Sequence, residues 1–260
     1  MIIAIDVGNT NIVLGCIENG TILNITRIRT EPDATSTEYA IKIKEILDLL
    51  EVDAKGIEGA VLSSVVPKVS EALCGAVKLV TGKDCLTVAP GVKTGLNIKI
   101  DDPSTLGPDL AVGAVDVNAC YRTPAIVVDM GTATTITAVD PSGAFIGGAI
   151  MPGISIGYSA LSAGTSLLPD ISISAPANVI GTNTVDCMRS GAVYGTAAMI
   201  DGMIDMMEKE IGQDCLVIAT GGRAAEIIKH CRHEIIHDDD LLLKGLWTIY
   251  SRNNKAAKKK

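Results

Sequence analysis

The chain has 260 residues, enough for one large domain or two small ones, and 47% of them are hydrophobic while 20% are charged. This balance provides material for buried cores and excludes global disorder. A net charge of −8 and a pI near 4.9 argue against a nucleic-acid-binding face, which needs a clustered basic surface.

Three strands separated by tight turns are predicted at the start of the chain. Thr35 followed by Glu38 has the spacing of a capping box, which predicts a helix start, and Pro67 favours the first turn of a second helix. The predicted order is β-β-β-α-β-α-β, with strands at 2–7, 11–17, 21–28, 58–63 and 85–89 and helices at about 36–51 and 67–80.

A loop is predicted from Pro90 to Gly107, which holds several glycines and prolines and shows no period. A helix from Pro108 to about Tyr121 leads into a second half with the same order of elements and an insertion at roughly 155–183. We therefore expect two domains, 1–107 and 108–260. The second half has predicted strands at 125–130, 134–139, 144–150 and 215–219, and helices after Pro152 and at about 184–211, 222–231 and 239–250.

The two halves share a repeated motif in which an apolar strand ends in an acid and a glycine turn. The sequence IIAIDVGNTN in the first half matches AIVVDMGTAT in the second, so that Asp6 aligns with Asp129 and Gly8 with Gly131, each at an offset of 123 (129 − 6 and 131 − 8). Such a turn frees backbone N–H groups for a phosphate, and the carboxylate can hold the divalent cation that the phosphate carries. The repeat predicts two facing clamps for a nucleotide and its metal.

The sequence predicts neither a signal peptide nor a membrane-spanning segment. Asp6 interrupts the first apolar run too early for a signal peptide, and Pro152 with several glycines breaks the longest apolar stretch, so we expect a cytoplasmic protein without a membrane span. The Lys-rich end, KAAKKK, is interpreted as a solvated tail.

The cysteines and histidines do not form a motif that predicts a metal site. Seven scattered cysteines without a C-x-x-C pair are interpreted as buried, reduced thiols. His233 and His237 have a helical i, i+4 spacing, but Ile235 and Ile236 between them favour a short strand over a metal-binding helix.

Three further features bear on the chemistry. The turns DVGNTN and DMGTATT supply carboxylates, hydroxyls and amides, the groups that handle phosphate and Mg²⁺. No G-x-x-x-x-G-K-[ST] sequence occurs, so a P-loop enzyme is not expected. The glycine pair in Thr220–Gly222 lies between a strand and a helix, where a flat ring can approach the backbone.

The chain resembles type III pantothenate kinases from end to end. The resemblance rests on an ordered set of motifs: DVGNTN, Gly107-Pro108-Asp109, DMGTATT, GGAIMPG, Thr220-Gly221-Gly222 and LLKGL. It implies the fold of the sugar-kinase, heat-shock-protein and actin superfamily, an actin-like α/β fold of two duplicated RNase-H-like halves that enclose ATP. It also implies an ATP-dependent phosphorylation of pantothenate to 4'-phosphopantothenate, the first step of coenzyme A biosynthesis, by a homodimer.

The same resemblance implies a role for each site residue. Asp109 would be the catalytic base, Gly107 would line the pantothenate pocket, and Thr184 would reach pantothenate from the neighbouring subunit. Asp6 would bind Mg²⁺, and Asp129 would lie near a monovalent cation, K⁺ or NH₄⁺. The residues implied in nucleotide binding are Asp6, Gly8, Asn9, Thr10 and Asn11 in the first turn, Gly131, Thr132 and Thr134 in the second, and Gly221 and Gly222 beside the adenosine.

One position departs from the family pattern and leaves an alternative open. Family members commonly have arginine where this chain has Leu110, and leucine lacks the fork of donors that could hold a carboxylate. A non-enzymatic, nucleotide-binding regulator on the same fold is therefore the alternative. A serine hydrolase is a weaker one, because Gly153–Gly157 matches G-x-S-x-G but no oxyanion loop accompanies it.

Overall fold

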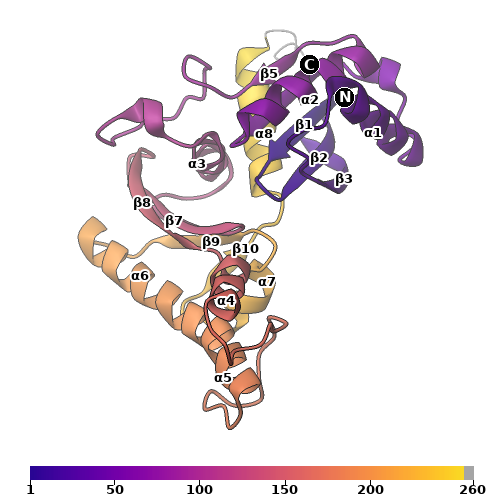
Figure 1. Cartoon of the computed structure of the whole chain (residues 1–260). Helices are drawn as coiled ribbons and strands as arrows, with labels where there is room; N and C mark the ends of the chain where they lie inside the picture. Colours follow the sequence, from indigo (N-terminus) through magenta and orange to yellow (C-terminus); the bar gives the residue numbers. More distant parts are fainter. Residues whose placement is uncertain (255–260) are drawn as a thin grey trace. The chain divides into compact units, whose positions relative to one another are not determined.

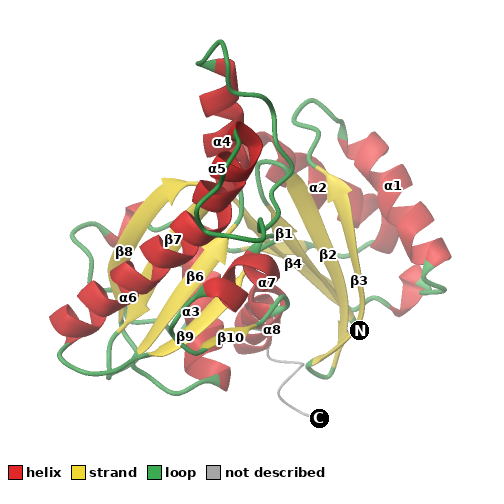
Figure 2. Cartoon of the chain, turned by 90° about the horizontal axis from the view of Figure 1, so that it is seen from below, coloured by secondary structure: helices red, strands yellow, loops and turns green. Residues whose placement is uncertain are grey.

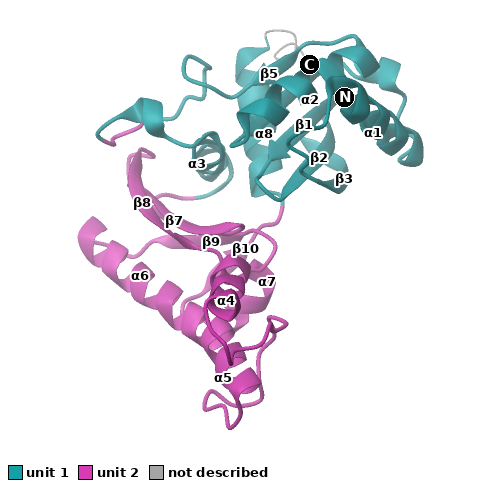
Figure 3. Ribbon diagram, viewed as in Figure 1, with its two compact units in different colours: residues 1–96, 101–121, 240–260 teal, residues 97–100, 122–239 magenta. Residues whose placement is uncertain are grey.

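A computed structural model describes residues 1–254, so the Lys-rich tail lies outside the described residues. The chain divides into two compact units, shown in different colours in Figure 3. The first unit contains Met1–Leu96, Asp101–Tyr121 and the described chain from Asp240 onward, and the second contains Asn97–Ile100 and Arg122–Asp239. The units therefore differ from the expected halves 1–107 and 108–260 in three segments: the helix after Pro108 and the last helix belong to the first unit, and Asn97–Ile100 belongs to the second.

The first unit is built on a five-stranded sheet in the order β3-β2-β1-β4-β5 (Figure 1). Its β1 is antiparallel to β2 and parallel to β4, with Asp6 opposite Val13 on one side and Ser63 on the other. The strands are β1 (Ile2–Val7), β2 (Asn11–Glu18), β3 (Thr21–Arg29), β4 (Gly59–Ser64) and β5 (Cys85–Thr87).

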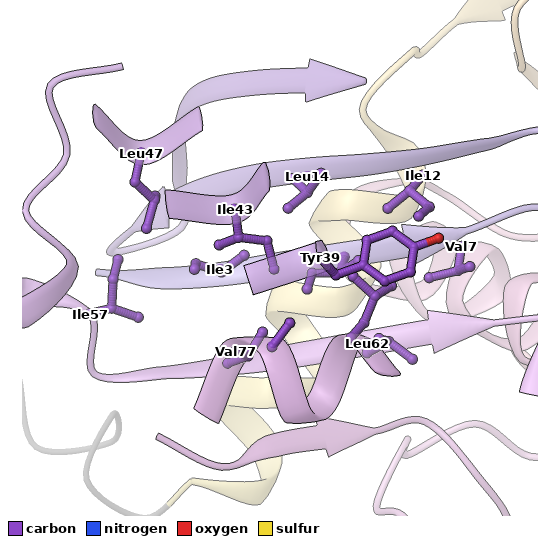
Figure 4. Close-up of a cluster of buried hydrophobic side chains, with 14 of the residues drawn as sticks. Ile3, Val7, Ile12, Leu14, Tyr39, Ile43, Leu47, Ile57, Leu62 and Val77 are labelled. Atoms are coloured by element: carbon purple, nitrogen blue, oxygen red, sulfur yellow. The ribbon is translucent and has the colours of Figure 1, made fainter. Parts of the chain in front are cut away.

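Helices α1 (Ser36–Leu49) and α2 (Pro67–Thr81) cover one face of this sheet, where Ile3, Ile5 and Val7 point into their core (Figure 4). The predicted capping box is confirmed: the Thr35 hydroxyl accepts from the Glu38 N–H at 3.3 Å, and the Thr35 N–H donates to the Glu38 carboxylate at 2.7 Å. Because side chains alternate along a strand, Ile3, Ile5 and Val7 lie on this face of β1 and the residues between them lie on the other.

Helices α3 (Pro108–Cys120) and α8 (Leu241–Asn253) form a second core with the opposite face of the same sheet. Ile2 and Ala4 of β1 contribute to this core together with Val112 of α3 and Leu243 of α8. The two helices come from distant parts of the sequence. Both belong to the first unit because the apolar stripe of each helix packs against this face of the sheet.

The second unit has a sheet in the order β10-β9-β6-β7-β8, and α6 runs across one face of it (Figure 2), where its side chains join the core of this unit. Ile126, Val128 and Met130 of β6 face this core, so Asp129 lies on the opposite face. The strands are β6 (Ala125–Met130), β7 (Ala133–Val139), β8 (Phe145–Pro152), β9 (Leu216–Thr220) and β10 (Ile235–His237), and the helices are α4 (Ile154–Ala163), α5 (Thr184–Ser190), α6 (Thr196–Ile211) and α7 (Ala224–Ile227).

The duplication predicted from the sequence is present in the topology of the two sheets. Like β1, β6 is antiparallel to the strand that follows it and parallel to a later one, β9. The turns differ in length, since Val7 pairs with Ile12 in the first sheet whereas Met130 pairs with Thr134 in the second. The constant offset of 123 therefore holds for the strand and the start of the turn but not for the pairing after it.

The helices of the second unit differ in detail from the prediction. The expected helix at 184–211 is interrupted by a π-helical segment, Gly191–Gly195, between α5 and α6, and the expected helix at 222–231 is a short α7 followed by a 3₁₀ turn. Within residues 1–254 no helix has the length and hydropathy needed to cross a membrane.

Candidate active site

The turn after β1 is held by hydrogen bonds within the first unit. The Gly8 N–H donates to the Asn11 carbonyl at 2.9 Å, and the Thr30 hydroxyl donates to the Gly8 carbonyl at 2.7 Å. The Thr30 N–H also donates to the carbonyl of Thr10 at 3.0 Å. Asn9, Thr10 and Asn11 are exposed, and Asp6 is half-buried just before them. The turn therefore presents its polar groups to solvent on a backbone that is already ordered.

Asp109 lies in the first turn of α3, two residues after the cap residue Gly107. A Cβ on Gly107 would lie 2.6 Å from Asp109 Oδ1, so a side chain at position 107 would collide with this carboxylate. Asp109 Oδ1 accepts the Leu110 N–H at 2.9 Å. Burial raises the pKa of Asp109, while the bonds from the backbone oppose that rise. A buried carboxylate with a raised pKa is a stronger proton acceptor than an exposed aspartate.

Asp6 and Asp109 belong to the same face of the first sheet. Asp6 has the parity of Ile2 and Ala4, which face the core shared with α3 and α8. On α3, Val112 packs into that core and lies three residues after Asp109, so the two share a side of the helix. The expected metal-binding acid and the expected base therefore belong to the same unit and to the same side of its sheet.

In the second unit, the turn after β6 holds the second set of predicted residues. The Gly131 N–H donates to the Ala133 carbonyl at 3.0 Å, and the Gly153 N–H donates to the Thr132 carbonyl at 3.1 Å. Thr134 is buried, with 1% of its surface exposed, whereas Thr132 is half-buried and Gly131 is exposed. This turn, like the one after β1, is therefore held by hydrogen bonds of its own backbone.

Two glycines from distant motifs approach the Asp129 turn. A Cβ on Gly153 would lie 2.3 Å from the Thr132 carbonyl oxygen, and a Cβ on Gly221 would lie 2.6 Å from Asp129 Oδ1. Gly221 also has a φ of +93°, a backbone angle that residues other than glycine rarely adopt. Three motifs that are far apart in the sequence therefore meet at the turn after β6, while Gly222 is exposed next to Gly221.

Thr184 is the exposed first residue of α5, and its predicted role involves a partner subunit that a single chain does not show. Asn183 caps this helix by accepting the Asp186 N–H at 3.0 Å. Leu110, at the position of the missing arginine, is half-buried and lies beside Gly107, with its Cγ 3.6 Å from where a Cβ would stand.

The structure also shows a pocket that sequence reasoning missed. It has a volume of about 200 Å³ and lies within the second unit, between α4, the chain near Asp170 and the residue after Gly222. The only sequence signal for it is the Ser-, Gly- and Ile-rich insertion at 155–183. The lining residues are Ser155, Tyr158, Ser159, Asp170, Ile171, Ser172, Ile173 and Arg223.

The histidines do not come together as a metal site. His233 Nε2 lies 2.7 Å from Asp205, His237 Nε2 lies 3.0 Å from Asp239, and the His230 ring packs edge-on against Tyr194. Asp205, Glu208 and His233 have ligand atoms within 4.8 Å of one another, but Asp205 is exposed and already pairs with Arg232.

Comparison with known proteins identifies the family. Residues 2–206 match the family model of type III pantothenate kinase. A type III pantothenate kinase from Moorella thermoacetica is 40% identical over 253 residues, which cover 97% of this chain and 100% of that protein.

Solved structures with lower identity show the fold. A Baf family transcriptional activator from Campylobacter jejuni has a TM-score of 0.62 at 20% identity, covering 97% of this chain and 98% of that one. Component A of the (R)-2-hydroxyglutaryl-CoA dehydratase of Acidaminococcus fermentans has a TM-score of 0.57 at 14% identity, with 99% of both chains covered. Together with the duplicated sheets, these confirm the actin-like α/β fold. Because the family model covers most of the chain and the ordered glycine and acid motifs have the contacts described above, the chain belongs to the type III pantothenate kinase family.

Proposed function

We propose that this protein transfers the γ-phosphoryl group of ATP to the 4'-hydroxyl of pantothenate, forming 4'-phosphopantothenate at the first step of coenzyme A biosynthesis. Family membership supports this reaction. The observation that carries the assignment of the site is the half-buried Asp109 carboxylate at the start of α3, on the same sheet face as Asp6.

Asp109 is the proposed base. It would accept the proton of the pantothenate hydroxyl as the oxygen attacks the γ-phosphorus, and its raised pKa makes the carboxylate a better acceptor. Gly107 would line the pantothenate pocket, where the lack of a side chain leaves the Asp109 carboxylate accessible. Leu110 supplies no charge for the carboxylate of pantothenate, so we expect weaker substrate binding than an arginine would give.

The two turns are the proposed phosphate sites. Asp6 supplies carboxylate oxygen, the ligand type that Mg²⁺ prefers, and the polar groups of Gly8, Asn9, Thr10 and Asn11 are the proposed phosphate donors. When bound, Mg²⁺ would neutralise charge that develops on the transferred phosphoryl group.

In the second unit, Gly131, Thr132 and Thr134 are the proposed counterparts, and Asp129 is the proposed neighbour of a monovalent cation. Gly221 and Gly222 would flank the adenosine. The close approach of Gly221 to Asp129 supports a shared nucleotide site in this unit.

A homodimer completes the proposal, with Thr184 of each subunit reaching pantothenate bound to the other. The exposed position of Thr184 at the start of α5 is compatible with that contact. We place the reaction in the cytoplasm, because all seven cysteines are free thiols, as proteins of reducing compartments have them.

Two aspartate variants test the proposal. Asp109→Asn should lower turnover by about 10² to 10⁴ while ATP binding stays nearly intact, the usual range for losing a positioned proton acceptor. Asp6→Asn should weaken Mg²⁺–ATP binding as well as turnover. Asp84→Asn is the control, because its carboxylate is 91% exposed and should affect neither.

The measurements are ATP-dependent phosphorylation of pantothenate and calorimetric binding of Mg²⁺–ATP. Full turnover by Asp109→Asn would remove it as the base, and equal loss of ATP affinity in both variants would assign Asp109 to the nucleotide site. A wild-type protein that binds ATP and leaves pantothenate unmodified would favour the regulator instead.

A further inference from the structure

Two cysteines that play no part in the proposed reaction meet between α2 and β5. The Gly82 N–H donates to the Lys78 carbonyl at 3.0 Å and ends α2 in a left-handed turn, after which the chain returns as the edge strand β5. This return places Thr87 of β5 at 3.5 Å from the Cys74 sulfur, and Cys85, two residues earlier on the same side of the strand, packs with Cys74 against the core of α1 and α2. Both side chains are half-buried, so small reagents can reach them.

The two thiols have opposite electrostatic environments. The side-chain hydrogen bond from Cys85 is the largest cause lowering the pKa of Cys74, to about 6, despite some burial, and the Thr87 hydroxyl 3.5 Å away adds a second bond. The same contact and burial raise the pKa of Cys85. The environment therefore favours the thiolate at Cys74 and the thiol at Cys85, which is the pairing of an attacking sulfur with a second one that can resolve it.

Three further cysteines, the buried Cys16 and Cys215 and the half-buried Cys231, lack this pairing. Burial raises the pKa of Cys16, that of Cys215 to about 11 and that of Cys231 to about 12. Their thiols are therefore protonated and unreactive at neutral pH, whereas Cys120 and Cys187 are exposed, contrary to the expectation that all seven would be buried.

We propose that Cys74 and Cys85 are a redox-active pair that closes into a reversible intramolecular disulfide by exchange with a low-molecular-weight disulfide. The Cys74 thiolate attacks one sulfur of that disulfide, forms a mixed disulfide and releases one thiolate. Cys85 then loses its proton and attacks the Cys74 sulfur, which releases the second thiolate. Two protein thiols are oxidised, and one external disulfide is reduced to two thiols.

The bond would connect α2 to the edge strand on the face opposite the proposed active site. Cys74 and Cys85 pack against the core of α1 and α2, whereas Asp6 has the parity of the residues that face α3 and α8. Closing the loop between them restricts the unfolded chain, so the melting temperature should rise in the oxidised protein. Phosphorylation of pantothenate should be unchanged, which separates this inference from the proposed function.

The full-length protein equilibrated in glutathione buffers of defined potential tests the pair. After alkylation and peptide mapping, Cys74 and Cys85 should lose their free thiols together, in one peptide pair linked by a disulfide, and dithiothreitol should restore both. The exposed Cys187 in the same samples is the internal control, because its modification measures the reaction of an accessible thiol without a partner cysteine. The proposal is overturned if glutathione modifies Cys187 while Cys74 and Cys85 stay reduced, or if wild-type Cys74 ends as a stable glutathione adduct.

Two variants at one position separate the hydrogen bond from the bridge. Cys85→Ser keeps a donor but cannot form the bridge, so Cys74 should stay reactive and accumulate as a mixed disulfide. Cys85→Ala removes the donor, and the pKa of Cys74 measured by its alkylation should rise. At pH 7 the alkylation rate should then fall by up to about fivefold, because most of the lost thiolate fraction is offset by higher nucleophilicity. Equal reactivity of Cys74 in both variants would refute the assigned role of Cys85.

Discussion

Replacing Gly245 with alanine tests whether the contact between α8 and α3 requires a glycine. A Cβ at this position would lie 2.3 Å from the Val112 carbonyl oxygen and 2.8 Å from its Cγ1. The first of these atoms is backbone, so relief requires the helices to move apart. Gly202 in α6 provides a matched control, because a Cβ there would meet nothing within 4 Å.

The two substitutions should change stability in opposite directions. Overpacking costs about 1 to 3 kcal/mol, which outweighs the gain of up to about 1 kcal/mol that alanine brings to a helix interior. Gly245→Ala should therefore lose up to about 2 kcal/mol, and Gly202→Ala should gain about 0.5 to 1 kcal/mol. At about 2 to 4 °C per kcal/mol for a chain of this size, the melting temperature should fall by up to about 8 °C in the first and rise by about 1 to 4 °C in the second.

Thermal unfolding followed by circular dichroism measures both shifts, and turnover provides a second readout. Because Val112 lies on the same side of α3 as Asp109, moving α3 should also lower the rate of pantothenate phosphorylation in Gly245→Ala, while Gly202→Ala keeps the wild-type rate. Equal stabilisation by both substitutions would contradict the close contact of α8 with Val112.

Three further results are expected. Burial raises the pKa of Asp109 above its value in the unfolded chain, so ionisation of Asp109 reduces stability as pH rises through the folded pKa. Asp109→Asn should therefore resist urea better than wild type at pH 7, and the two proteins should become equally resistant in acid, below both pKa values. Equal resistance at pH 7 would contradict burial of the charge. K⁺ should raise the rate at limiting ATP relative to Na⁺ by supplying charge near Asp129, and equal rates would reject that ion site. Light scattering at micromolar concentration should give twice the 27.0 kDa of one chain, whereas the mass of a monomer would reject the dimer.

Local signals in the sequence predicted most of the elements. Alternation and tight turns located the first three strands of each sheet, and the Thr35 capping box located the start of α1, because each signal depends on neighbouring residues only. The repeat of the acid-and-glycine turn likewise predicted two sheets with the same connection. The alignment of the two copies is wrong by one residue after the turn that follows β6, because this turn is one residue shorter than the turn after β1. Nothing in the local sequence pattern specifies the length of a turn.

The residues of the candidate site were identified mainly through the family resemblance. Why each position requires its residue type becomes clear only from the contacts in the structure. Gly107 is explained by the Asp109 carboxylate beside it, and Gly221 by its approach to Asp129. The pocket lined by Arg223 was missed, because its members come from separate parts of the insertion and from the chain after β9 and share no spacing.

The sequence by itself determined the order of the elements, the repeat and the family, because these depend on residue type and spacing along the chain. Only the tertiary structure decided that α3 and α8 cover the same face of the first sheet and that Cys74 meets Cys85. Strand alternation specifies that a face is apolar but not which distant helix covers it, and a thiol acquires its reactivity from neighbours that only folding brings close.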